Sequence, residues 1–142
     1  MFKYNILSEE VKSDFAFEVN ADNLSELFRG AGIATMEAMV NVKEFEAKRV
    51  WEFKIESDTL DLLLFDFLGE LVFVKDVESV LFKDYEIIIE ENDKFKLSCK
   101  AFGDDIDYEK YEILTDVKAV TMHKFVLEKR NDEWYCHIIL DL

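Results

Sequence analysis

The chain ends with two carboxylates on neighbouring residues, the side chain of Asp141 and the terminal group of Leu142. They are the last two residues of "WYCHIILDL", a stretch with strand-like alternation. Two negative groups this close repel each other unless water solvates them, or a cation or a basic partner neutralises them. Spacing alone favours the simplest of these interpretations, a solvated acidic terminus.

Other residues that could do chemistry lack the spacing of a known motif. Gly30 and Gly32 in "GAGIA" lie inside a helical pattern, and the third glycine of a dinucleotide-binding loop is absent. The two histidines, His123 and His137, belong to no zinc-type cluster with cysteine. No spacing of serine, histidine and aspartate singles out a catalytic triad.

Two groups of carboxylates resemble chemical sites only superficially. One could be a glycosidase pair but is more simply the exposed face of an acidic helix: Asp58, Asp61, Asp66 and Glu70. The other, in "GDDIDYEKYE", lacks the glycine and the terminal glutamate of an EF-hand. A hydrolase with its own active site is therefore unsupported by the residues alone.

The composition is that of a folded, strongly acidic protein. Half of the 142 residues are hydrophobic and the net charge is −15. Such a charge repels phosphate backbones, so we expect no direct binding to nucleic acid, and it favours cations and basic protein surfaces. The sequence has no apolar run long enough to span a membrane, and its start lacks the apolar core of a signal peptide. We therefore expect a cytoplasmic protein.

The elements that must position these residues are predicted from hydrophobic periodicity. Period-two segments flank two helical patterns near residues 23–39 and 58–74, the first opened by Asn23 with Glu26 three residues on. Turn residues in "END" and "RND" join later antiparallel strands, and "YEILTDVKAVTM" is expected to supply one or two short strands. We predict an α+β fold in which two helices pack on largely antiparallel sheet, as a single domain over residues 1–142. Cys99 and Cys136 fall on the apolar faces of strands and are expected to be reduced core residues.

Four segments, in order along nearly the whole chain, resemble the archease family. The C-terminal stretch "VKAVTMHKFVLEKRNDEWYCHIILDL" is similar to the family's VKAVTYH-like motif and the hairpin that follows it. "SDFAFEVNADNLSELF" is similar to its N-terminal strand and helix start, "LLLFDFLGELVFVKD" to its second helix, and "SVLFKDYEI" to the strand after that helix. Together these matches are much more specific than any one of them.

The resemblance implies an accessory protein and not an enzyme. Archeases assist the RNA-splicing ligase RtcB, which joins RNA ends during tRNA splicing and is activated by guanylylation of a histidine. The family also has a divalent metal site, which on this chain corresponds to Asp14, Asp141 and the terminal carboxylate of Leu142. These hard oxygen ligands suit Ca²⁺ or Mg²⁺, and water could complete the shell.

Further residues match the family motifs, and their roles stay open. Glu70 corresponds to an acidic position of the second helix. Lys118, Thr121 and His123 match the VKAVTYH-like motif, and for Lys118 and His123 we keep a contact with the partner and a structural role as equal hypotheses.

The chain also departs from the family near the first aspartate. Val11 stands where many archeases have a histidine, and an alternative alignment puts Lys12 in place of the aspartate. Asp14 is preferred because the segment that follows it then aligns without a gap. Two other functions remain as alternatives, a stand-alone metal-dependent hydrolase and a general chaperone or adaptor.

Overall fold

The computed structural model describes residues 1–7 and 14–142, so Val11 and Lys12 lie outside the described residues. Seven strands, two α-helices and one 3₁₀ helix follow each other along the described part of the chain: β1 (Phe2–Leu7), β2 (Asp14–Ala21), α1 (Leu24–Glu37), η1 (Val42–Glu44), β3 (Arg49–Ser57), α2 (Leu60–Glu78), β4 (Val80–Glu91), β5 (Phe95–Asp105), β6 (Ala119–Arg130) and β7 (Glu133–Asp141).

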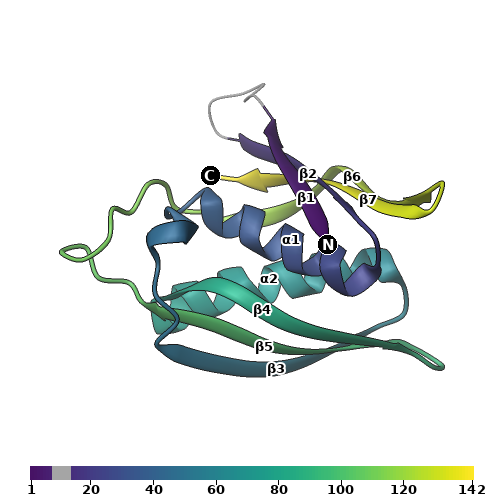
Figure 1. The fold of residues 1–142 in the computed structure, drawn as a ribbon, viewed down its shortest axis with the longest axis horizontal. Coiled ribbons are helices and arrows are strands. Elements are labelled where there is room, and N and C mark those ends of the chain that lie inside the picture. Colours follow the sequence, from purple (N-terminus) through teal and green to yellow (C-terminus); the bar gives the residue numbers. More distant parts are fainter. Residues whose placement is uncertain (8–13) are drawn as a thin grey trace.

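The strands form two antiparallel sheets, ordered β1-β2-β7-β6 and β3-β5-β4. The two helices lie between the sheets (Figure 1). The predicted fold class, α+β with two helices packed on antiparallel sheet, is confirmed. None of the described helices is both long and apolar enough to cross a membrane.

Both helices begin at residues that cap their first turn. The Asn23 side chain accepts a hydrogen bond from the backbone N–H of Glu26 at 2.9 Å, as the sequence predicts. Thr59 does the same for the N–H of Leu62 at 3.2 Å. The second helix is longer than predicted and ends only before Ser79, which has the left-handed φ of 55°. Of the added residues 75–78, Lys75 is buried and the other three are exposed.

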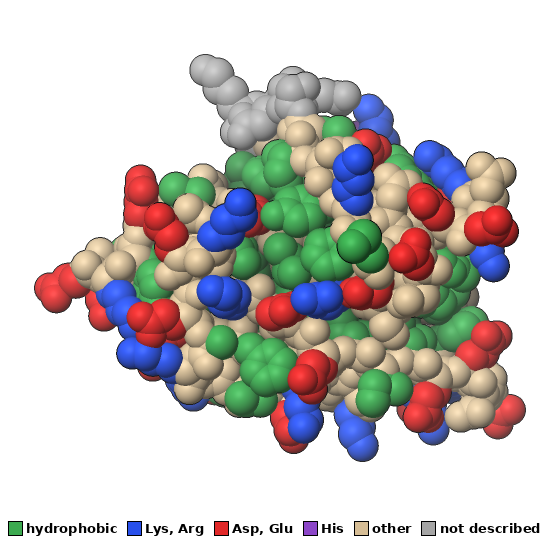
Figure 2. Space-filling model, in the orientation of Figure 1, with side chains coloured by type: hydrophobic (Ala, Val, Ile, Leu, Met, Phe, Trp, Pro, Cys, Tyr) green, Lys and Arg blue, Asp and Glu red, His purple; other side chains and the backbone are tan. Residues whose placement is uncertain are grey.

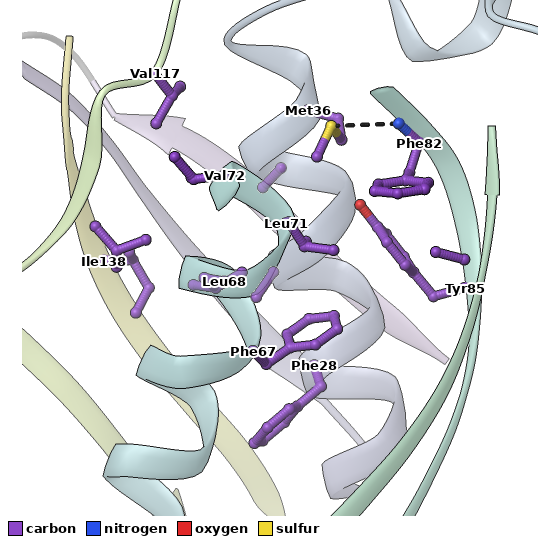
Figure 3. Packing of buried hydrophobic residues seen from close by; sticks show 14 of the residues in the cluster. Phe28, Met36, Phe67, Leu68, Leu71, Val72, Phe82, Tyr85, Val117 and Ile138 are labelled. Atoms are coloured by element: carbon purple, nitrogen blue, oxygen red, sulfur yellow. Dashed lines mark hydrogen bonds between the residues drawn. The ribbon is translucent and has the colours of Figure 1, made fainter. Parts of the chain in front are cut away.

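The core lies where the two helices meet both sheets. Phe67 of α2 packs against Phe28 of α1, with ring centroids 5.8 Å apart, and against Tyr85 of β4 at 5.7 Å (Figure 3). Residues from both helices and both sheets belong to one hydrophobic cluster. Cys99 and Cys136 are free and buried in it, as the sequence analysis expected, and burial raises the pKa of each thiol to about 12.

The segment between β5 and β6 differs from the prediction. The segment "YEILTDVKAVTM" was expected to supply one or two short strands. It supplies one bridge, between Val40 and Ile113, and the first residues of β6, whereas residues 114–118 between them are not in a strand. Lys75 on α2 is buried, and its Nζ donates to the Val117 carbonyl at 2.6 Å and to the Asp116 carboxylate. The Lys75 side chain therefore satisfies the Val117 carbonyl, a backbone group that a strand partner would otherwise bind.

Candidate metal and partner-contact site

The two predicted aspartate ligands are direct cross-strand partners. Asp14 is the first residue of β2 and Asp141 the last of β7, and the antiparallel register sets them opposite each other. Side chains at such positions share one face of the sheet, with Cβ atoms about 4.5–5.5 Å apart. Two segments that are far apart in sequence thus bring two carboxylates together.

The alternation of β2 and β7 decides which face this pair occupies. The neighbouring pair, Phe15 and Leu140, points toward the helices, and Leu140 is fully buried. Asp14 and Asp141 therefore point away from the core and are half-buried. Neither forms an ion pair with any described residue. Like charges at this separation destabilise the sheet unless something else neutralises them.

The C-terminal strand is held on both sides because β7 lies between β2 and β6. The N–H of Lys118 donates to the carbonyl of Asp141 at 2.8 Å. The hydroxyl of Thr121 donates to the carbonyl of Ile139 at 2.9 Å. Leu142 is half-buried and its side chain packs on the core. The "VKAVT" stretch thus fixes the strand that carries Asp141.

The chemistry of these donors fits a hard cation. Two side-chain carboxylates and a terminal carboxylate offer only oxygen, which Ca²⁺ and Mg²⁺ prefer. Among residues 1–7 and 14–142, no three His, Cys, Asp or Glu side chains gather closely enough to hold a metal ion. A site here therefore needs the terminal carboxylate of Leu142, and metal binding stays a prediction.

The other motif residues lie in different environments. Lys118 and His123 have exposed side chains, and His123 makes no hydrogen bond within the described chain. Glu70 is half-buried on α2 and has no hydrogen-bond or ion-pair partner there either. The Lys118 side chain and His123 are available to a partner, whereas Thr121 and the backbone of Lys118 have structural contacts.

Sequence reasoning missed two residues that organise this region. Lys75 fixes the segment that leads into β6, and a lysine among the apolar residues of a helix was the available signal. The Nδ1 atom of His137 lies 2.8 Å from the carbonyl oxygen of Lys124, a contact that joins β7 to the irregular part of β6. No spacing rule identifies the latter, because it depends on an irregular strand.

The negative charge is not gathered into one patch on the face shown in Figure 2. Acidic and basic side chains are interspersed there around hydrophobic ones. Arg29 belongs to one mixed-charge group of the molecule: its Nε donates to Asp84 at 2.7 Å and its Nη1 donates to Glu26. Burial is the largest single influence and would raise the pKa of Asp84, but the hydrogen bonds from the Arg29 guanidinium and the Tyr85 N–H, together with nearby positive charge, lower this pKa below its ordinary value. In the described part of the chain, no basic side chain forms such an ion pair with Asp14 or Asp141.

Comparison with known proteins identifies the family. Residues 4–142 match the sequence model of the Archease protein family (MTH1598/TM1083). The protein archease of Pyrococcus abyssi is 37% identical over 135 residues, which cover 94% of this chain and 95% of that protein. The protein archease of Archaeoglobus fulgidus is 32% identical over 130 residues, covering 92% and 93%.

Solved structures agree with these matches. The solution structure of Methanobacterium thermoautotrophicum protein 1598 has a TM-score of 0.83 and 31% identity, over 99% of this chain and 98% of that one. A Thermotoga maritima archease, described as a possible chaperone, shares the fold with a TM-score of 0.64 and 18% identity, over 96% of each chain. The chain belongs to the archease family, as the sequence motifs indicated.

Proposed function

We propose that this protein is an accessory factor of the RNA-splicing ligase RtcB, which promotes guanylylation and multiple turnover of the ligase in tRNA splicing. The family membership supports this proposal. The cross-strand pair of Asp14 and Asp141 is the structural observation that supports the metal site proposed with it. A protein with a charge of −15 reaches the RNA through its protein partner and does not bind the RNA itself.

The proposed metal ligands are Asp14, Asp141 and the terminal carboxylate of Leu142. Bound there, Ca²⁺ or Mg²⁺ would offset the repulsion between the carboxylates. The chain's own contribution is positional: β2 and β6 hold β7 from both sides, so the terminus is presented in one place. The exposed Lys118 and His123 side chains, and Glu70 on α2, are the proposed contacts with the ligase.

A multiple-turnover ligation assay tests the proposal. The ligase, GTP, metal and RNA ends are held constant, and the protein is added at substoichiometric and equimolar concentrations. We expect more than one ligation per ligase molecule only when this protein is present. Unchanged turnover would refute the proposal.

Two matched measurements separate the alternatives. A stand-alone hydrolase predicts metal-dependent cleavage of phosphate esters by the protein alone. A general chaperone predicts reduced aggregation of unrelated unfolded proteins, independent of metal. An accessory factor specific to the ligase predicts neither result.

A further inference from the structure

Strand β6 contains an irregular segment beside the strand that carries Asp141. Thr121 and Val126 are five positions apart on β6, but their partners on β7, Ile139 and His137, are only two apart. β6 therefore holds three extra residues here, and we call residues 122–125 the β6 bulge. Bulges of this kind redirect side chains out of a sheet. The exposed side chains of the β6 bulge include His123.

The β6 bulge has an uncommon backbone conformation. Lys124 has a φ of 52°, in the left-handed region that few residues other than glycine adopt. Such a conformation persists only when its surroundings hold it. Local sequence does not explain it, because "MHKF" contains neither glycine nor asparagine.

Two hydrogen bonds to β7 hold the β6 bulge at its ends. Before it, the Thr121 hydroxyl donates to the Ile139 carbonyl at 2.9 Å. At its far end, the His137 ring nitrogen Nδ1 lies 2.8 Å from the Lys124 carbonyl oxygen. A carbonyl oxygen only accepts, so Nδ1 must carry the proton of this hydrogen bond.

We propose that His137 is a positioning residue for partner binding. Its Nδ1–H holds the carbonyl of Lys124 and thereby the β6 bulge, in the conformation that presents His123 to the ligase. The partner-binding half of this inference rests on the proposed function. The structural half, that one imidazole donor orders the β6 bulge, does not depend on any ligase.

Substitutions of His137 that differ only in donor position test the inference. In His137→Asn the amide nitrogen takes the place of Nδ1, whereas in His137→Gln it takes the place of Nε2. His137→Leu removes the donor by replacing the imidazole with an apolar side chain of similar size. Asn20→Leu is the control, because Asn20 lies on the same outer face of the sheet and makes no side-chain hydrogen bond in the described chain.

The first readout needs no partner. ¹⁵N relaxation should give backbone order parameters of about 0.85 for the β6 bulge in the wild type, His137→Asn and Asn20→Leu. In His137→Gln and His137→Leu they should fall below about 0.6. Equal order parameters in all five proteins would overturn the inference, whatever the ligase assay shows. If His137→Leu does not fold, the comparison of His137→Asn with His137→Gln still tests the inference.

The second readout is ligase activation at limiting protein concentration. We expect His137→Gln and His137→Leu to lose about fivefold or more, as for one lost hydrogen bond, and His137→Asn to retain activation. A loosened β6 bulge with full activation would overturn the partner-binding half. Failure of the wild type to activate would instead refute the proposed function and leave the order parameters as the test of the structural half.

Discussion

Asp14 and Asp141 lie directly opposite each other across β2 and β7, on the face of the sheet that points away from the helices. Like charges directly opposite each other destabilise a sheet, so a cation or a basic group bound here would stabilise the fold. Asp141 is the last residue of β7, which lies between β2 and β6, and it directly precedes the C-terminal Leu142.

The first prediction is that Ca²⁺ or Mg²⁺ stabilises the protein through this pair. Asp14→Asn and Asp141→Asn should weaken metal binding, and so should an extension beyond Leu142, which moves the terminal carboxylate. Wild-type stability should rise with cation concentration, by about 2.7 kcal/mol at 100 times Kd. Calorimetric titration and thermal unfolding measure both effects.

Asp93→Asn is the matched control, because Asp93 is an exposed aspartate in the turn between β4 and β5. It should bind the cation like the wild type. If all these variants bind equally, the acidic terminus is merely solvated.

A second prediction compares two glycines with opposite surroundings. A Cβ on Gly103 would lie 1.9 Å from the carbonyl oxygen of Leu81, a backbone atom that cannot rotate away. A Cβ on Gly69, on α2, would meet nothing within 4 Å. Gly103→Ala should therefore lower the free energy of unfolding by about 1–3 kcal/mol. Gly69→Ala should raise it by about 0.5–1 kcal/mol, because glycine is a poor helix residue. Urea unfolding measures both free energies. Changes of the same sign in the two variants would contradict the packing described for these glycines.

Much of this fold was predictable from sequence because local rules and tertiary structure agree. Asn23 starts α1 where its capping geometry requires, and the "RND" turn contains Asn131 at a φ of 57°. The part that could not be predicted depends on distant residues. Ile113 forms an isolated bridge with Val40, and Lys75 on α2 binds the segment that follows it through side-chain hydrogen bonds.

Part of the candidate site was likewise predictable from the sequence, and part was not. Asp14 and Asp141 were found through a family motif, and nothing in their spacing reveals that they face each other. Their pairing follows from β7 being inserted between β2 and β6, a property of the whole sheet. The role of His137 could not be predicted from the sequence because its acceptor, the Lys124 carbonyl, is positioned by an irregular strand.

The third prediction concerns Lys75. Its side chain is 5% exposed and donates to the Val117 carbonyl at 2.6 Å. Lys75→Met keeps the apolar length and leaves that carbonyl without its donor, so it should lower the free energy of unfolding by about 1–3 kcal/mol. Lys96→Met, at an exposed position, should change it by less than about 0.5 kcal/mol. Chemical denaturation compares the two, and equal effects would mean that the buried ammonium group contributes nothing specific.

The fourth prediction is a pH dependence at Asp104. The Tyr111 hydroxyl donates to its carboxylate at 2.7 Å and, as the largest cause, lowers the pKa of Asp104 below its ordinary value of about 3.8. A lowered pKa in the folded state contributes stability above about pH 3.8, which is lost as pH falls through the folded pKa. Tyr111→Phe should raise the pKa of Asp104, measured by NMR titration, and move acid unfolding to higher pH. Tyr108→Phe is the control, since Tyr108 is exposed. An unchanged Asp104 titration in Tyr111→Phe would show that the hydroxyl does not set this pKa.

The last prediction separates the two motif residues Thr121 and His123. Thr121 donates to the Ile139 carbonyl, so Thr121→Val should lower the free energy of unfolding by about 1 kcal/mol. His123 is exposed and makes no hydrogen bond in the described chain, so His123→Ala should change stability by less than about 0.5 kcal/mol. If His123 contacts the ligase, His123→Ala should nevertheless reduce ligase activation. Thermal unfolding and the ligation assay, run on the same preparations, give the two quantities. A loss of stability in His123→Ala that accounts for its loss of activation would assign this histidine a structural role instead.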